Sequence, residues 1–150
     1  MRLIAPKIVI ILSVLFSFQI ANAQEKPKGE LIDSFTYSNS EDASARIDNF
    51  RLMLENSPNN GGYVIVYGGK VGKKGEIEAH IRGLQQAFTL KRIDHERVPI
   101  IKGGYREKVT IEFWNIPEGA EFPKPTPTVD AKKVRVKGVS KKIIPYECCF

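Results

Sequence analysis

Cysteine, histidine and tryptophan are scarce in this sequence. The 150 residues include two cysteines, two histidines and one tryptophan. Cys148 and Cys149 are adjacent and close to the C-terminal end, so neither has a disulfide partner elsewhere in the chain. Two neighbouring sulfurs also fall short of the four ligands that a structural zinc site usually takes. The composition therefore predicts no metal site and a core that forms without disulfide bonds.

Motifs that would place a catalytic group are missing as well. His80 and His95 are far apart in the sequence, and no Gly-x-Ser-x-Gly segment groups a nucleophile with a base. Close carboxylates such as Glu76 and Glu78 are typical of a solvated surface. We therefore expect no enzyme and no cofactor. A small secreted enzyme is the alternative, and it requires a cleft with a base and a nucleophile about 3 Å apart.

No apolar run is long enough to span a bilayer, but the N-terminus carries a shorter one. Basic residues precede the apolar segment 8–20, which falls short of the roughly 20 residues that a membrane-spanning helix needs. Ala21-Asn22-Ala23 then offers the small-x-small pattern that signal peptidase cuts. The sequence predicts a cleaved signal peptide at 1–23, a mature chain beginning at Gln24 and a periplasmic or secreted location. The alternative is a segment that stays uncleaved as an anchor.

Acidic and basic residues nearly balance over most of the chain, although the formal net charge is +6. Residues 24–123 hold 14 Lys or Arg against 15 Asp or Glu. Residues 124–150 hold seven basic residues against two acidic ones, so the basicity belongs to the tail. An exported chain meets no genomic DNA, so we expect the tail to face an anionic envelope polymer, lipid headgroups or an acidic protein partner. The alternative is that these charges only keep the tail solvated.

Apolar spacing predicts alternating strands and helices over residues 31–122. Segments 31–35, 63–67, 97–101 and 109–114 have the β-branched, aromatic or alternating patterns typical of strands. Two intervening segments repeat apolar residues at helical spacing, the first after a capping-box pattern at Ser38 and Glu41. The order β-α-β-α-β-β predicts an α/β (α+β) two-layer sandwich with both helices on one face of a mixed sheet. The two helical stripes are Ala43, Ile47, Phe50 and Leu54, and Ile77, Ile81, Leu84 and Phe88.

Composition divides the chain into successive parts. After the signal peptide, residues 24–122 form the α/β domain, residues 123–129 a Pro-rich linker and residues 130–150 a basic tail with the cysteine pair. The linker has proline at every second position and should be extended. The tail alternates apolar and basic residues from Val134 onward, so we expect it to add a strand to an exposed sheet edge of its own chain or of a partner.

An aromatic row is expected on the second face of the sheet. Strand periodicity places Tyr63, Tyr67 and Trp114 opposite Val64 and Val66. We favour the interpretation that the Pro-rich linker covers this row. The alternative is an uncovered row that binds a partner or a sugar.

The second half of the domain carries three consecutive motifs. They are Arg92-Ile93-Asp94-His95-Glu96-Arg97-Val98, Gly103-Gly104-Tyr105-Arg106-Glu107 and Lys108-Val109-Thr110-Ile111-Glu112. These motifs resemble the C-terminal half of OmpA-like domains, in which a Gly-Ile-x-x-x-Arg-Val turn, a Gly-Tyr-Gly-Glu corner and a strand of Arg-Arg-Val-Glu-Ile type follow one another. The resemblance covers about 80 residues when the preceding elements are included. It implies a periplasmic domain that holds peptidoglycan through its diaminopimelate.

Two positions depart from the pattern of that family. The Asp that usually follows the strand at 63–67 is missing, and Gly68-Gly69-Lys70 stands there. The Arg-Ala pair of the next helix is also missing, and Arg82 lies near the place of the arginine that would hold the diaminopimelate carboxylate. The resemblance therefore implies the fold and the periplasmic compartment, whereas the residues that would bind the ligand depart from the pattern of the family.

Residues 68–75 follow a strand and open a helix, a place where free backbone N–H groups and the helix dipole attract anions. Lys70, Lys73 and Lys74 strengthen this positive field, although the spacing is not that of a P-loop. With Arg82 and Arg106, these lysines are the candidate ligand-binding residues. The alternative is a flexible, solvated turn.

These patterns together predict an exported, non-catalytic envelope-binding protein that contacts peptidoglycan or another anionic envelope polymer. We expect no nucleic-acid partner and no stable membrane span after cleavage. The alternative function is a secreted assembly factor that pairs with a protein partner or a second copy through its tail strand. Cys148 and Cys149 would lock that contact, but they could also form a strained ring between neighbours or stay as free thiols.

Overall fold

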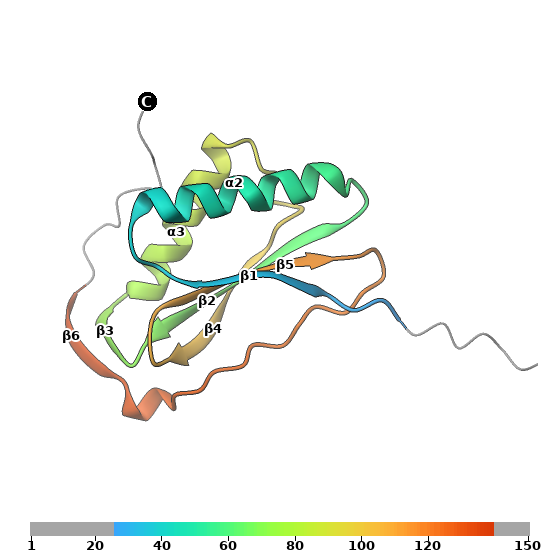
Figure 1. Ribbon diagram of the computed structural model, residues 1–150. Coiled ribbons are helices and arrows are strands. Elements are labelled where there is room, and N and C mark those ends of the chain that lie inside the picture. Colours follow the sequence, from blue (N-terminus) through green and yellow to red (C-terminus); the bar gives the residue numbers. More distant parts are fainter. Residues whose placement is uncertain (1–25, 140–150) are drawn as a thin grey trace, which may run out of the picture.

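The computed structural model describes residues 26–139, in which a mixed sheet lies between two helices and an extended linker (Figure 1). Neither the signal peptide predicted at 1–23 nor the pair Cys148 and Cys149 falls within the described residues. In chain order the elements are β1 Glu30–Thr36, α2 Ser40–Asn56, β2 Gly61–Gly69, β3 Val71–Lys74, α3 Glu76–Leu90, β4 Ile100–Arg106, β5 Thr110–Ile116, the 3₁₀ helix η2 Ala131–Lys133 and β6 Arg135–Val139.

The main sheet has four strands in the order β1-β5-β2-β4. Strand β2 is parallel to β4 and antiparallel to β5, and β5 is antiparallel to β1. The central β2 is buried from Gly62 to Gly69, as its run of β-branched and aromatic residues predicts. Both helices lie on one side of this sheet in Figure 1, so the predicted α/β two-layer sandwich is confirmed.

Helix α2 presents the predicted stripe to the sheet, because Ala43, Ile47, Phe50 and Leu54 are all buried. The predicted capping box at Ser38 was wrong. Asn39 is the N-cap, and its side-chain oxygen accepts the backbone N–H of Asp42 at 2.8 Å. Asn and Ser are nearly equal as N-caps, so the sequence pattern alone could not separate the two positions.

Helix α3 completes the core on the same side of the sheet. Ile77, Leu84 and Phe88 are buried and Ile81 packs against the core, which confirms the second stripe. Phe50 of α2 stacks on Phe113 of β5, with 4.7 Å between the ring centroids. The two helices thus bury one continuous apolar core against β1, β2 and β5.

The third predicted strand, 97–101, was displaced, because β4 runs from Ile100 to Arg106. Gly103 and Gly104, which the resemblance to OmpA-like domains placed at a corner, lie inside this strand. At Gly103 a Cβ would lie 2.5 Å from Cε1 of Tyr67, and Gly104 has a φ of 89° beside Pro127. Close packing by an aromatic ring and by the linker therefore requires both glycines.

The Pro-rich linker covers the face of the sheet opposite the helices, and Figure 1 shows it crossing below the strands. Tyr63 and Tyr67 are buried there with Ile65 and Ile116. The ring of Phe122 contacts that of Tyr63 at a centroid distance of 4.9 Å. The prediction that the linker covers the aromatic row is confirmed.

The tail forms β6, which pairs in parallel with β3 as a separate two-stranded sheet. The predicted tail strand is therefore present, but it extends no edge of the main sheet. Its partner β3 lies within the segment 68–75, which the sequence pattern presented as a loop. Among the described helices, none has the length and apolar character needed to cross a membrane.

Candidate functional site

A cavity of about 400 Å³ opens where β2 ends and α3 begins. The segment 68–75 forms one side of it, and the first turn of α3 forms another. Residues of β4 and two valines near β6 complete the lining. The side chains of interest are Lys73, Lys74, Glu76, Glu78, Lys102, Tyr105, Val134 and Val136.

The start of α3 turns backbone N–H groups toward this cavity, and its first turn also brings the carboxylates of Glu76 and Glu78 into the lining. Gly75 is the N-cap with a φ of 77°, and it has no side chain that could cap the first turn. Helix N-termini carry free N–H groups and the positive end of the helix dipole. Glu76 of the first turn lies against Gly72, where a Cβ would come within 2.4 Å of Oε2 of Glu76. A glycine at position 72 therefore lets this carboxylate approach β3.

The lysines of the cavity differ in their pairing. Lys102 donates to Oε1 of Glu78 at 2.6 Å, and this hydrogen bond lowers the pKa of the Glu78 carboxyl. Lys73 and Lys74 are exposed, and within residues 26–139 neither forms an ion pair. Lys73 and Lys74 are thus the cations of the cavity that remain available to an anionic ligand.

The structure brings together only two of the five predicted ligand-binding residues. Lys73 and Lys74 line the cavity, whereas Lys70, Arg82 and Arg106 are not among its lining residues. Lys70 donates to both carboxylate oxygens of Glu107, at 3.0 and 3.3 Å. Arg82 is exposed on α3 one turn after Glu78. The loop spacing that suggested three convergent lysines missed the ion pair of Lys70.

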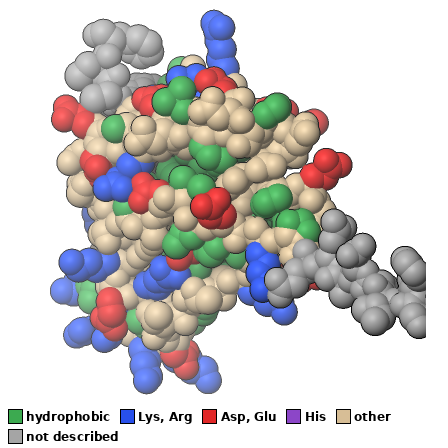
Figure 2. Space-filling view, turned by 45° about the vertical axis from the view of Figure 1, so that its right-hand side comes forward, with side chains coloured by type: hydrophobic (Ala, Val, Ile, Leu, Met, Phe, Trp, Pro, Cys, Tyr) green, Lys and Arg blue, Asp and Glu red, His purple; other side chains and the backbone are tan. Residues whose placement is uncertain are grey.

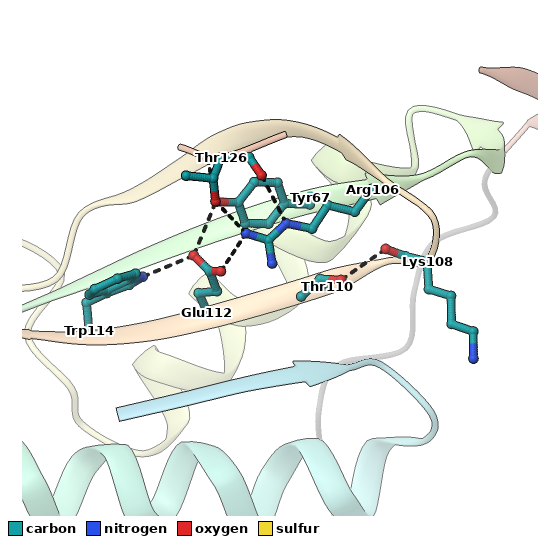
Figure 3. A network of polar contacts seen from close by, with 7 residues as sticks. All are labelled: Tyr67, Arg106, Lys108, Thr110, Glu112, Trp114 and Thr126. Atoms are coloured by element: carbon teal, nitrogen blue, oxygen red, sulfur yellow. Dashed lines mark hydrogen bonds and ion pairs between the residues drawn. The ribbon is translucent and has the colours of Figure 1, made fainter. Parts of the chain in front are cut away.

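Arg106 belongs to a buried polar network on the linker side of the sheet (Figure 3). Its Nη2 donates to Oε1 of Glu112 at 2.7 Å and to Oγ1 of Thr126 at 2.8 Å. Its Nε donates to the backbone carbonyl of Thr126 at 3.3 Å, and its guanidinium lies 3.7 Å from the ring centroid of Tyr67. The charge of Arg106 is therefore used within the protein and not offered to a ligand.

Glu112 is the centre of this network and is only 5% exposed. Its Oε2 accepts the Tyr67 hydroxyl and the Trp114 ring N–H, each at 3.2 Å. The Tyr67 hydroxyl accepts the backbone N–H of Thr126 at 3.1 Å in turn. A buried carboxylate is tolerated when its oxygens are hydrogen-bonded and its charge is paired, as here.

This network fixes the path of the chain toward the cavity. The network attaches the linker at Thr126. Two residues further on, the backbone carbonyl of Tyr105 accepts the backbone N–H groups of Thr128 and Val129 at 3.0 and 3.1 Å. The chain then reaches Val134 and Val136 beside the cavity. One sequence feature could have indicated this network. Glu112 lies two residues before Trp114 in an alternating strand, so it is expected on the same face of the sheet as the aromatic row.

Besides the Tyr67 hydroxyl that donates to Glu112, a second hydroxyl contacts a base at Thr89, whose Oγ1 lies 2.9 Å from Nε2 of His95. Thr89 and His95 are both exposed, and the Thr89 hydroxyl donates to the Gln85 carbonyl. Neither residue lines the cavity at α3. His80 is buried against Tyr37, and burial lowers its pKa to about 4. Within residues 26–139, no group of three His, Cys, Asp or Glu side chains could hold a metal ion.

Comparison of the chain with protein-family models, curated proteins and solved structures finds no match.

Proposed function

We propose that this protein is an exported, non-catalytic binding protein of the cell envelope. Its cavity would hold an anionic group of an envelope polymer, with peptidoglycan as the first candidate. The observation that carries the proposal is the position of Lys73 and Lys74, which lack ion pairs within the described residues, beside the uncapped start of α3.

The lining of the cavity suits a carboxylate on a short peptide. Two lysines and the helix N-terminus supply positive potential, and Tyr105, Val134 and Val136 supply contact area. Pockets of this kind use a few polar groups to orient a ligand and apolar surface to retain it. The carboxylates of cell-wall peptides have the required charge.

The resemblance to OmpA-like domains supports the same ligand class. The Asp expected after β2 is missing, but Glu76 lies in the same cavity as Lys73 and Lys74. A carboxylate next to two ammonium groups matches a zwitterionic ligand such as diaminopimelate. We therefore assign Glu76 to the ligand ammonium and the two lysines to a ligand carboxylate.

Sedimentation with purified peptidoglycan tests this proposal. The double variant Lys73→Ala/Lys74→Ala should bind at least about tenfold more weakly, because each exposed charge-assisted contact contributes roughly 1 kcal/mol. The control is Lys108→Ala/Lys124→Ala, which removes the same charge at exposed positions outside the cavity lining. Free diaminopimelate should compete with binding of the unaltered chain. Equal binding by the two double variants would contradict the proposal.

A second candidate is an assembly factor that pairs through its tail, because every residue of β6 is exposed and, among residues 26–139, the strand pairs only with the short β3. An unpaired strand edge is a template for a partner strand. Cys148 and Cys149 would then join two chains. Non-reducing and reducing gels test this candidate, and a monomer on both gels would remove the disulfide-linked form.

A further inference from the structure

Four cations follow one another along η2 and β6. Lys132, Lys133, Arg135 and Lys137, here called the tail strip, are all exposed, and within residues 26–139 none of them forms an ion pair. Figure 2 shows several Lys and Arg side chains, with a few Asp or Glu side chains among them, at the left and lower left of the molecule, on the side where Figure 1 places β3 and β6. The tail strip is therefore a positively charged surface that the rest of the domain does not neutralise.

The tail strip faces away from the cavity. Val134 and Val136 line the cavity, and strand alternation places Arg135 and Lys137 on the other side of β6. None of the four cations lines the cavity. The tail strip is therefore a set of cations outside the cavity lining, although Lys74 of the cavity pairs with Val139 on the adjacent β6.

Exposed valines accompany these cations. Val71 of β3 pairs directly with Arg135 and is 46% exposed, and Val139 at the end of β6 is 71% exposed. Exposed apolar residues next to basic ones are typical of surfaces that rest on a membrane interface.

The backbone of the tail strip is held in place before any partner arrives. The side chain of Asp130 accepts the backbone N–H of Lys132 at 2.9 Å and caps η2. The backbone N–H of Arg135 donates to the carbonyl of Lys70 at 2.8 Å, next to β3. The linker before η2 is attached to the sheet through Thr126. A preorganised array of charges loses less entropy on binding than a flexible basic tail would.

We infer that the tail strip docks on a bilayer surface rich in anionic phospholipid headgroups, with Val71 and Val139 in contact with the interface. Clustered Lys and Arg residues are attracted to such surfaces. A nucleic acid is a poorer fit, because binding of single strands relies on aromatic stacking, and β3, η2 and β6 contain no aromatic residue. A cell-wall peptide is better suited to the cavity than to the exposed surface of the tail strip.

Vesicle sedimentation tests the inference with the chain from Gln24 to Phe150, because the apolar segment 8–20 would itself bind lipid. The chain should bind vesicles of phosphatidylcholine mixed with phosphatidylglycerol and should not bind phosphatidylcholine alone. High salt should weaken the binding, since surface charges are screened. Changing all four tail-strip residues to Ala should weaken it by about a hundredfold or more, because each basic residue near an anionic surface accounts for about a fivefold change.

The matched control removes four other lysines from the exposed surface, Lys26, Lys28, Lys108 and Lys124. This control has the same net charge as the tail-strip variant but leaves the tail strip intact, and for that reason it should keep nearly all of the lipid binding. Circular dichroism should show that both variants are folded. Equal loss in the two variants would mean that net charge alone drives binding and would overturn the inference, as would unaltered binding by the tail-strip variant.

Two further readouts complete the test. Val139→Ser should weaken vesicle binding several-fold, whereas Leu52→Ser, at an exposed leucine of α2, should leave it unchanged. The tail-strip variant should still sediment with peptidoglycan, and Lys73→Ala/Lys74→Ala should still bind vesicles. Loss of both ligands in both variants would indicate one shared basic surface and would overturn the assignment of separate sites.

Discussion

The two faces of the main sheet are covered in different ways. On one face, α2 and α3 bury an apolar core that includes Phe50, Phe88 and Phe113. On the other face, a linker without regular secondary structure lies over Tyr63 and Tyr67, and the contact runs through a buried polar network. The buried aromatic residues differ accordingly, with Phe in the core under the helices and Tyr in the cluster under the linker.

The difference follows from where each covering segment places its backbone hydrogen bonds. A helix satisfies its interior N–H and C=O groups internally, so it can cover a sheet with apolar side chains alone. An extended linker has no internal partners, so the sheet must supply them. Tyr67, Arg106 and Tyr105 do so for the backbone of residues 126–129. The hydrogen bonds on the linker face therefore fix the position of the linker, and with it the point at which β6 begins.

The largest effect is expected on the helix face. Phe113→Ala should lower the free energy of unfolding by about 3–5 kcal/mol, because it leaves a cavity between Phe35 and Phe50. Urea denaturation measures this change, and Leu52→Ala on the exposed side of α2 should cost at most about 0.5 kcal/mol. A loss of less than about 1 kcal/mol for Phe113→Ala would show that this face is not the main source of stability.

The linker face should respond to a single polar change. Arg106→Ala should cost about 2–3 kcal/mol, because the carboxylate of Glu112 stays buried without its ion pair while Tyr67 and Trp114 still donate to it. The linker should also be cut faster by protease at residues 122–129, whereas Phe113→Ala should not direct cleavage there in the folded state.

Arg51→Ala is the matched control for that change. Arg51 pairs with Glu55 on the surface of α2, where the loss should be at most about 0.5 kcal/mol. If Arg106→Ala and Arg51→Ala cost the same and the linker is cut at the same rate in both, then the buried network does not hold the linker.

The sequence predicted one face of the sheet more completely than the other. Helical spacing predicted the stripes of α2 and α3 because burial on a regular helix leaves a periodic signal. Strand alternation also placed Tyr63 and Tyr67 on the linker side. The hydrogen bonds of Arg106 and Glu112 could not be predicted, since they join residues whose contact depends on β4, β5 and the linker together.

The candidate site was also predicted only in part, because local sequence patterns do not reveal contacts between distant segments. The glycines and lysines of 68–75 suggested an anion-binding loop, and Lys73 and Lys74 do line a cavity there. Strand β3 was missed because its four residues, Val71 to Lys74, acquire strand geometry only by pairing with β6, which lies about 60 residues later. Lys70 was misjudged because its partner, Glu107, follows β4 and is 37 residues away in the sequence.

The last of the expected effects depends on pH and concerns the helix face. His80 of α3 is buried against Tyr37, and this burial lowers its pKa from 6.5 to about 4. Between these two values the unfolded chain binds a proton that the folded chain does not bind, so stability should fall as the pH drops from 6.5 to 4. The full loss should be about 2–3 kcal/mol.

Urea denaturation of the unaltered chain and of His80→Leu across this pH range measures the effect. The leucine variant should lose the part of the slope that His80 contributes, because no proton is taken up at position 80 on unfolding. Arg106→Ala should keep that slope, since its change lies on the other face of the sheet. If the free energy of unfolding changes equally with pH in the unaltered chain and in His80→Leu, then His80 is solvated in the folded state. Water would then reach this part of the core under the helices.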